Sequence, residues 1–232
     1  MIIPASRNWG SDPMPGTTTT APAPPPAKAK ARKKATAPAG ASARGRVDRE
    51  GAVVLIAELF REYGYHGTSY GQITEATGLG KGSLYNYFPD GKEGMTRAVL
   101  AHVHGWFEDH VFAPLEGDTE AAKAVAGMFK AVDDYFHSGR RICLLGAFSL
   151  YDARDAFDRE IAGYFTRWVA ALKTCLRRGG VAADKAGMLA MACMVDIQGG
   201  LVMAQALDRP AVFRDTLKRS RLSLDVALEA VA

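Results

Sequence analysis

The chain has 232 residues, of which 48% are hydrophobic and 23% are charged. This composition is typical of a globular protein and excludes a chain that is disordered throughout. Its apolar runs fall short of the roughly 20 residues that a spanning helix needs, and no secretory h-region begins the chain. Three cysteines without disulfide or metal spacing favour a reducing compartment. We therefore expect a cytoplasmic protein without a membrane partner.

The net charge of +4 is unevenly distributed. Residues 1–46 contain eight Lys or Arg and one acid, whereas residues 47–232 contain 21 bases and 24 acids. The basic segment is rich in Ala, Pro, Thr and Lys, so it cannot bury enough apolar surface to offset the entropy of ordering. We predict a disordered basic arm over residues 1–46 that attracts nucleic-acid phosphates.

The first helical pattern begins at residue 47. Four apolar residues at three- and four-residue spacing form one face: Val53, Ile56, Ala57 and Phe60. This predicts a helix over residues 47–63 that ends at Gly64. Thr68 is a suitable N-cap for a second helix over residues 69–77, with Ile73 and Ala76 facing inward.

A short third helix is expected at residues 81–87, after a glycine turn at 78–80. Leu84 and Phe88 are four residues apart and would anchor one face to the core. The opposite face carries small, forked or planar polar residues that suit an approach to base edges in the major groove of DNA. These predicted DNA contacts are Lys81, Gly82, Ser83, Tyr85, Asn86 and Tyr87.

Three further residues are predicted to contact phosphates. Thr68 and Ser69 lie at the start of a helix, where N–H groups and hydroxyls bind anions, and Lys92 lies at the start of the next helix. The alternative is a helical hairpin in which Tyr85 and Tyr87 are ordinary surface aromatics. The order of the elements over residues 47–92 favours a helix-turn-helix.

The rest of the chain shows no period-two alternation and no internal repeat, so the fold class is all-α. We expect a three-helix DNA-binding domain at residues 47–92 and a larger helical domain for effector binding and dimerisation at residues 93–232. The helices of the larger domain, the first of which starts at its boundary, are predicted at residues 91–113, 119–138, 141–152, 155–179, 183–207 and 211–230.

The larger domain is rich in aromatic and methionine side chains, which either fill a core or line an adaptable cavity. Three acids, Asp133, Asp152 and Asp155, would favour a cationic ligand there, or are exposed charges at helix ends. The run MLAMACMVDIQGGLVMAQAL is apolar on almost every face, so we expect residues 183–207 and 211–230 to form a homodimer seam.

Residues 47–95 resemble the DNA-binding domain of the tetracycline-repressor (TetR) family. The matching elements are IAELFREYGYHGTS, QITEATGLGKGSLYNYF and KEGM. Gly80 replaces the hydroxyl residue usual before the lysine, and the junction from Phe88 to Glu93 carries one extra residue. That insertion and the segment CLLGAFSLYDARDAF resemble the branch typified by LmrA and YxaF, repressors of multidrug-efflux genes.

The resemblance implies a repressor that binds a palindromic double-stranded operator as a homodimer. It also implies release by a small lipophilic effector. The effector binds in a cavity among helices four to seven and moves the fourth helix. The residues that we expect to line that cavity are Trp106, Phe129, Phe148, Tyr151, Phe165 and Trp168.

Other functions find less support. The GKGS segment at residues 80–83 has Glu75 where a phosphate loop needs glycine, and no catalytic constellation or cofactor motif occurs, so we expect neither an enzyme nor a cofactor. A metal sensor using His102, His104 and His110, or a redox sensor using Cys143, Cys175 and Cys193, is an alternative on the same scaffold. A helical ligand-binding protein without operator recognition is another.

Overall fold

A computed structural model describes residues 47–150 and 153–231, and every regular element in that part of the chain is helical, as predicted. The predicted arm at residues 1–46 lies outside the described residues. In chain order the elements are α1 (Arg49–Gly67), α2 (Tyr70–Thr77), α3 (Lys81–Tyr87), α4 (Gly91–Phe107), the π-helix η1 (Glu108–Phe112), α5 (Ala113–Glu116), α6 (Ala121–Tyr135), the 3₁₀ helix η2 (His137–Gly139), α7 (Leu144–Phe148), α8 (Ala153–Ala156), α9 (Asp158–Arg178), α10 (Ala183–Ala206) and α11 (Pro210–Glu229).

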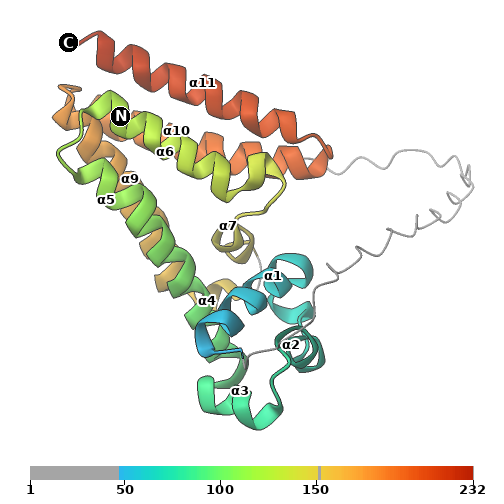
Figure 1. Ribbon diagram of the computed structural model, residues 1–232. Helices are drawn as coiled ribbons and strands as arrows, with labels where there is room; N and C mark the ends of the chain where they lie inside the picture. Colours follow the sequence, from blue (N-terminus) through green and yellow to red (C-terminus); the bar gives the residue numbers. More distant parts are fainter. Residues whose placement is uncertain (1–46, 151–152, 232) are drawn as a thin grey trace, which may run out of the picture. The chain divides into compact units, whose positions relative to one another are not determined.

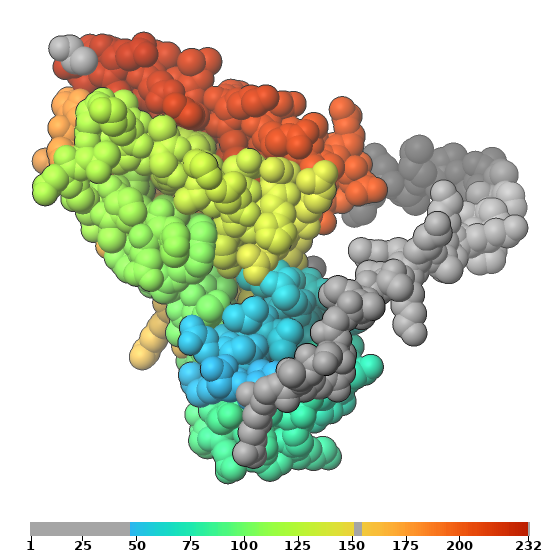
Figure 2. All heavy atoms as spheres, viewed as in Figure 1, coloured from blue at the N-terminus to red at the C-terminus, as the bar shows by residue number. Residues whose placement is uncertain are grey.

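The helices form two groups that α4 joins (Figure 1). Helices α1, α2 and α3 pack together at one end, and α6, α10 and α11 pack together at the other. Helix α4 leaves the first group, and its continuation through η1 and α5 runs along α9 toward the second. Helix α3 therefore lies at the end opposite α11, where its side chains form the outer surface (Figure 2).

The core of the first group follows the predicted apolar face of α1. Val53, Ile56, Ala57 and Phe60 are all buried, together with Leu84 and Phe88 of the α3 segment. The Asp48 side chain caps α1 by accepting a hydrogen bond of 2.8 Å from the Gly51 N–H. Gly64 interrupts the helical backbone with φ of 70°, as its predicted role as a stop requires.

Two predictions for α2 were wrong. Ser69, and not Thr68, is the N-cap, because the Ser69 hydroxyl accepts from the Gln72 N–H while the Gln72 side chain accepts from the Ser69 N–H. Thr77 faces inward in place of the exposed Ala76, since its hydroxyl donates to the Ile73 carbonyl over 2.7 Å and accepts from the Leu79 N–H. Gly78 follows in the left-handed region with φ of 68°, which produces the turn into α3.

The predicted helix 91–113 does not end at Pro114. The path widens into η1 after Phe107 and then continues through α5, where Pro114 lies in the first turn and needs no N–H partner. Arg167 of α9 holds this bulged stretch through both Glu108 and Glu116, at distances of 2.6 and 2.7 Å. The hydrogen bond from Arg167 lowers the pKa of Glu116.

Three other predicted helices are shorter than expected. Helix 119–138 ends at Tyr135, because His137, Ser138 and Gly139 all adopt positive φ, of 49°, 53° and 91°. Helix 141–152 is reduced to the five residues of α7, and helix 155–179 begins only after Phe157. The Phe157 backbone is not helical, at φ −132°, and its ring is buried against Phe148. The last two predicted helices agree with α10 and α11 within one residue.

Helix α10 is long and apolar enough to cross a membrane by length and composition alone, with a mean hydropathy of 1.5 over its most apolar window. A helix of this kind also occurs where several faces contact protein. One face of α10 approaches α11 closely at Gly200, where an added Cβ would lie 3.2 Å from Thr216. A second face packs on α9.

Candidate nucleic-acid interface and ligand groove

Helix α3 exposes the polar face that its sequence predicts. Lys81, Gly82, Tyr85 and Asn86 are exposed and Ser83 and Tyr87 are half-buried, whereas Leu84 and Phe88 anchor the helix from behind. A Cβ added at Gly82 would meet no atom within 4 Å, so the helix backbone is open to close approach there. An exposed polar helix face with an open backbone is what readout in a major groove requires.

Tyr85 is held in place by Tyr70, which we did not predict. Their rings stack with centroids 6.1 Å apart at an interplanar angle of 21°. Burial, and then a hydrogen bond with Tyr85, raise the pKa of Tyr70. A Cβ added at Gly91 would lie only 2.6 Å from the Tyr70 hydroxyl, and Gly91 has a φ of 62°. Tyr70 thus ties the exposed face of α3 to the start of α4.

Arg49 is a second residue that we did not predict. Its Nε donates to the Tyr87 carbonyl over 3.4 Å, and its guanidinium lies 5.3 Å from the centre of the Phe88 ring. These contacts place a fixed positive charge beside the end of α3. The signal was available in the sequence, because Arg49 is one of only four bases in residues 47–92.

One of the three predicted phosphate contacts, Thr68, is wrong, whereas Ser69 and Lys92 stay predictions. The Thr68 hydroxyl is buried and donates to the carbonyls of Leu59 and Gly64, over 3.2 and 2.8 Å, so it joins α1 to α2 instead of facing solvent. The Lys92 ammonium lies 4.8 Å from the centre of the Tyr65 ring, and burial lowers its pKa. Ser69 remains exposed at the start of α2.

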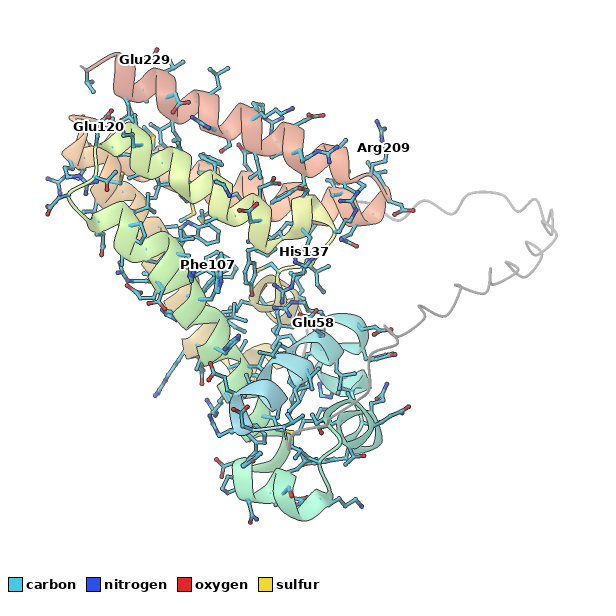
Figure 3. The ribbon with its side chains drawn as sticks, in the orientation of Figure 1. Glu58, Phe107, Glu120, His137, Arg209 and Glu229 are labelled. Carbon is cyan, nitrogen blue, oxygen red and sulfur yellow. The ribbon has the colours of Figure 1, made fainter. Side chains whose placement is uncertain are left out.

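Three of the six aromatic residues predicted to line a cavity, Phe129, Phe148 and Trp168, are buried in the core. Phe107, labelled in Figure 3, lies 4.9 Å from Trp168 and 4.8 Å from Tyr135, between ring centres. Trp106 stacks on His110 at 4.5 Å, and Phe129 is buried in the same core. Phe148 packs on Phe60 of α1 at 6.0 Å. Trp106 is only half-buried and Tyr151 lies outside the described residues, and the effector-binding role of all five side chains stays a prediction.

A groove of about 1070 Å³ lies between α7, α9 and α10, and among the described residues that we predicted, Phe165 alone lines it. We call this feature the groove. Its walls are mainly aliphatic and sulfur-containing side chains, among them Ile142, Leu150, Val169, Met191, Met194 and Leu201. Such a surface accepts apolar molecules and adapts to their shape.

Few polar groups reach the groove. Gln198 lies near its middle, and the buried Gln198 Nε2 has no hydrogen-bond partner among the described residues. Lys173 is the only ionisable base in the lining, and no acid lines the groove in residues 47–150 and 153–231. Asp133 and Asp155, two of the acids considered for a cationic ligand, are not part of the lining, and Asp152 is not described.

The alternative sensors gain little from the geometry. Cys143, Cys175 and Cys193 are buried, and burial raises the pKa of all three thiols, that of Cys193 to about 12. A raised pKa suppresses the thiolate that reacts with oxidants. Within the described ranges no group of three or more His, Cys, Asp or Glu side chains could hold a metal ion.

Helix α7 lies between the groove and α1. Gly146 and Ala147 line the groove, whereas Phe148 contacts Phe60 and Tyr65. Just before α7, Arg141 donates to the Glu58 carboxylate of α1 over 2.5 Å, and Figure 3 shows Glu58 and His137 on the two sides of this junction. Arg61 also donates to Glu58, over 2.7 Å, and to the Tyr135 hydroxyl, over 3.0 Å.

A further exposed apolar surface lies on α10 and α11 outside the groove lining. Met188 is 67% exposed, and Leu222 and Val226 of α11 are similarly exposed. Val195 and Val202, which are 64% and 59% exposed, belong to the groove lining instead. We call Met188, Leu222 and Val226 the outer stripe. Helix α10 thus carries apolar residues toward α11, toward the groove and outward, which explains why the sequence is apolar on every face.

Comparisons with known proteins match both parts of the chain. Residues 54–99 match the family model for bacterial regulatory proteins of the tetR family, and residues 120–219 match the model for the LmrA/YxaF-like transcriptional regulator C-terminal domain. An uncharacterized HTH-type transcriptional regulator of Mycobacterium tuberculosis is 28% identical over 68% of this chain and 84% of its own length. LmrA of Bacillus subtilis is 24% identical over 67% and 85%.

Solved structures share the fold. A TetR transcriptional regulator from Legionella pneumophila is 21% identical, with a TM-score of 0.66, over 80% of this chain and 98% of its own. A cysteine mutant of CifR, solved with double-strand operator DNA, is 24% identical, with a TM-score of 0.59, over 82% and 100%.

Proposed function

Because this chain belongs to the TetR family of bacterial regulatory proteins, we propose that it represses transcription by binding a palindromic operator as a homodimer. The members of this family are transcriptional regulators and not enzymes. We further propose that a small lipophilic effector in the groove releases the protein from DNA. Such a regulator acts in the cytoplasm.

The single observation that carries the DNA-binding role is the exposed polar face of α3. Its backbone is open at Gly82, and its Asn86 is an amide of the kind that pairs with adenine. Lys81 supplies a charge for a phosphate, and Tyr85 is fixed by its stack on Tyr70. Ser69, Ser83 and Tyr87 border this face and complete the proposed contact surface.

The test is a fluorescence anisotropy titration with duplex DNA from the region flanking the gene, against a scrambled duplex. Asn86→Ala should cost about 1–3 kcal/mol of binding and relax specificity, because it removes a base contact. Lys81→Ala should weaken binding to every sequence and reduce the salt slope by about 1. Lys123→Ala on α6, an exposed lysine far along the chain, is the control and should change neither quantity.

Failure of these variants to affect binding would remove α3 as the reading helix. Absence of any sequence-specific binding by the unaltered protein would favour the other candidate, a helical ligand-binding protein without operator recognition.

The proposed dimer uses the outer stripe of α10 and α11. Exposed apolar side chains on two adjacent helices favour burial against a second copy, and a two-fold axis repeats each contact. Two α3 helices must then lie about 34–36 Å apart to reach successive major grooves. Analytical ultracentrifugation should show a dimer that Met188→Asp dissociates and that Val54→Asp, on the exposed side of α1, leaves intact. A dimer that survives Met188→Asp would place the interface elsewhere.

Release by an effector requires a connection from the groove to α1, and α7 supplies one. A ligand that displaces Gly146 and Ala147 also displaces Phe148 and Arg141, which contact Phe60 and Glu58. This adds a second route to the movement of α4 expected from the family. The route requires only that the ligand prefers one of two positions of α7.

A further inference from the structure

We infer that the groove binds an elongated lipophilic anion, with an acidic group beside Lys173 and an acceptor oxygen at Gln198. This inference rests on the proposed function only in taking the groove as the effector site. It concerns the chemistry of the ligand, and three features of the described residues support it: length, charge and one unpaired donor.

The groove is long in one direction. Its α10 wall extends from Met191 to Gln205, which at 1.5 Å per residue corresponds to about 21 Å. Apolar side chains of α9 and α7 line the rest. An extended chain or a row of fused rings covers this length, whereas a compact molecule leaves much of the apolar wall in contact with water.

Charge selects the sign of the ligand. Of the described residues that line the groove, Lys173 alone has an ionisable base, and none is an acid. The Lys173 side chain lies along Gly187 of α10, where an added Cβ would be 3.8 Å from its Nζ. This exposed side chain therefore lies at one end of the groove, where a cationic ligand would meet repulsion, and no described lining residue supplies a compensating carboxylate.

Gln198 adds a donor within the apolar wall. Its amide lies beside Gly146, where an added Cβ would be 2.6 Å from Gln198 Oε1. The unpaired Gln198 Nε2 is buried, and a buried donor without an acceptor destabilises the folded chain. A ligand oxygen at this point would satisfy the donor.

The two polar points are separated along α10. Gln198 is eleven residues from Gly187, the neighbour of Lys173, which corresponds to about 16 Å. The best ligand therefore has its acidic group at one end and a hydroxyl or carbonyl partway along the chain.

The test uses displacement of Nile red, a neutral dye that fluoresces in apolar surroundings, from the full-length protein. Hexadecanoate, hexadecanol and hexadecylamine, each below its micelle concentration, compare three head groups on one chain. Hexadecanoate should displace the dye at a concentration roughly fivefold lower than hexadecanol, as expected for one partly exposed charge pair, and hexadecylamine should be weakest. Lys173→Gln should abolish the difference between acid and alcohol, and Lys173→Glu should favour the amine.

Lys185→Gln is the matched control, because Lys185 is an exposed lysine at the start of α10 outside the groove lining. Gln198→Leu tests the second point: it should weaken a mid-chain hydroxy derivative of octadecanoate more than octadecanoate itself. Equal effects on the two acids would overturn the role of Gln198.

Other outcomes separate this inference from the proposed function. Tightest binding of the amine, or an unchanged acid preference in Lys173→Gln, overturns the inference even where operator binding is intact. Dye binding seen only in the dissociated Met188→Asp variant also overturns it, since a second copy would then occupy the groove. Acid-selective binding by a protein that ignores operator DNA supports the inference and rejects the repressor.

Discussion

The junction between α1 and α7 predicts an unequal response to two substitutions that break the same ion pair. Arg141 and Arg61 both bind Glu58, and their side chains are 20% and 6% exposed, against 54% for Glu58. Arg141→Met leaves Glu58 half-exposed and still paired with Arg61. Glu58→Gln leaves Arg61 buried without a carboxylate, and its Nε already has no partner among the described residues.

The magnitudes follow from burial. Arg141→Met loses one charge-assisted hydrogen bond to a half-exposed acid and a cation–π contact of 4.6 Å with Tyr135, together about 1–1.5 kcal/mol. Glu58→Gln removes the countercharge of a nearly buried guanidinium, where breaking a fully buried pair costs about 3–5 kcal/mol. Because solvent reaches Glu58 and glutamine keeps an acceptor oxygen, we expect about 2–3 kcal/mol.

Urea unfolding followed by circular dichroism, at one fixed protein concentration, measures both free energies. The double variant should cost little more than Glu58→Gln alone, because Arg141 has then already lost its acid. Lys130→Gln is the control: it breaks a pair with Asp134 in which both side chains are mostly exposed, and it should leave the urea midpoint unchanged. Equal destabilisation by the two single variants, or a larger loss for Arg141→Met, would refute the assignment of Arg61 as the buried member.

Three further predictions test other parts of the molecule. Thr68→Val should lower the free energy of unfolding in urea by about 1–2 kcal/mol, because it removes a buried hydrogen-bonding hydroxyl, and it should leave operator affinity unchanged. Weaker DNA binding at full stability would instead support a phosphate contact by Thr68. The raised pKa of Cys193 means that the folded state favours the protonated thiol, so the stability present below pH 9 should fall between pH 9 and about 12. Cys193→Ala should flatten this fall in alkaline unfolding curves. Deletion of residues 1–44 should weaken DNA binding and flatten its dependence on salt, and equal slopes for both proteins would reject a role for the arm.

The helix-turn-helix could be predicted because its signals are local. The spacing of Val53, Ile56 and Phe60 defines one face within a single helix, and Leu84 and Phe88 do the same for the α3 segment. Gly78 marks the turn because its backbone is left-handed, with a φ of 68°, which glycine adopts without strain. The error at Thr68 was also local: two adjacent hydroxyl residues compete to cap α2, and the buried carbonyls of α1 bind the first of them.

The groove could not be predicted in this way, because it depends on packing between helices distant in sequence. Trp168 and Phe165 lie on the same helix, three residues apart, yet Trp168 contacts Phe107 in the core and Phe165 lines the groove. Both are large aromatic residues, so their type alone does not indicate which one lies in the core and which one lines the groove. The signals that were available are polar exceptions: Gln198 interrupts an apolar run, and Lys173 follows an apolar segment of α9. The break at Phe157 likewise depends on its contact with Phe148.

The energy of the junction is of the size that regulation requires. A change of 1.4 kcal/mol alters an equilibrium constant about tenfold, which is close to the value expected for the contact of Arg141 with Glu58 and Tyr135. In the proposed dimer two such junctions act on one DNA complex, and if each contact forms only in the DNA-binding arrangement, their combined loss corresponds to about a hundredfold weaker binding. A ligand in the groove need not unfold α7 to achieve this. It needs only to hold Arg141 out of reach of Glu58 in both subunits, and its own preference for that arrangement sets the limit of release.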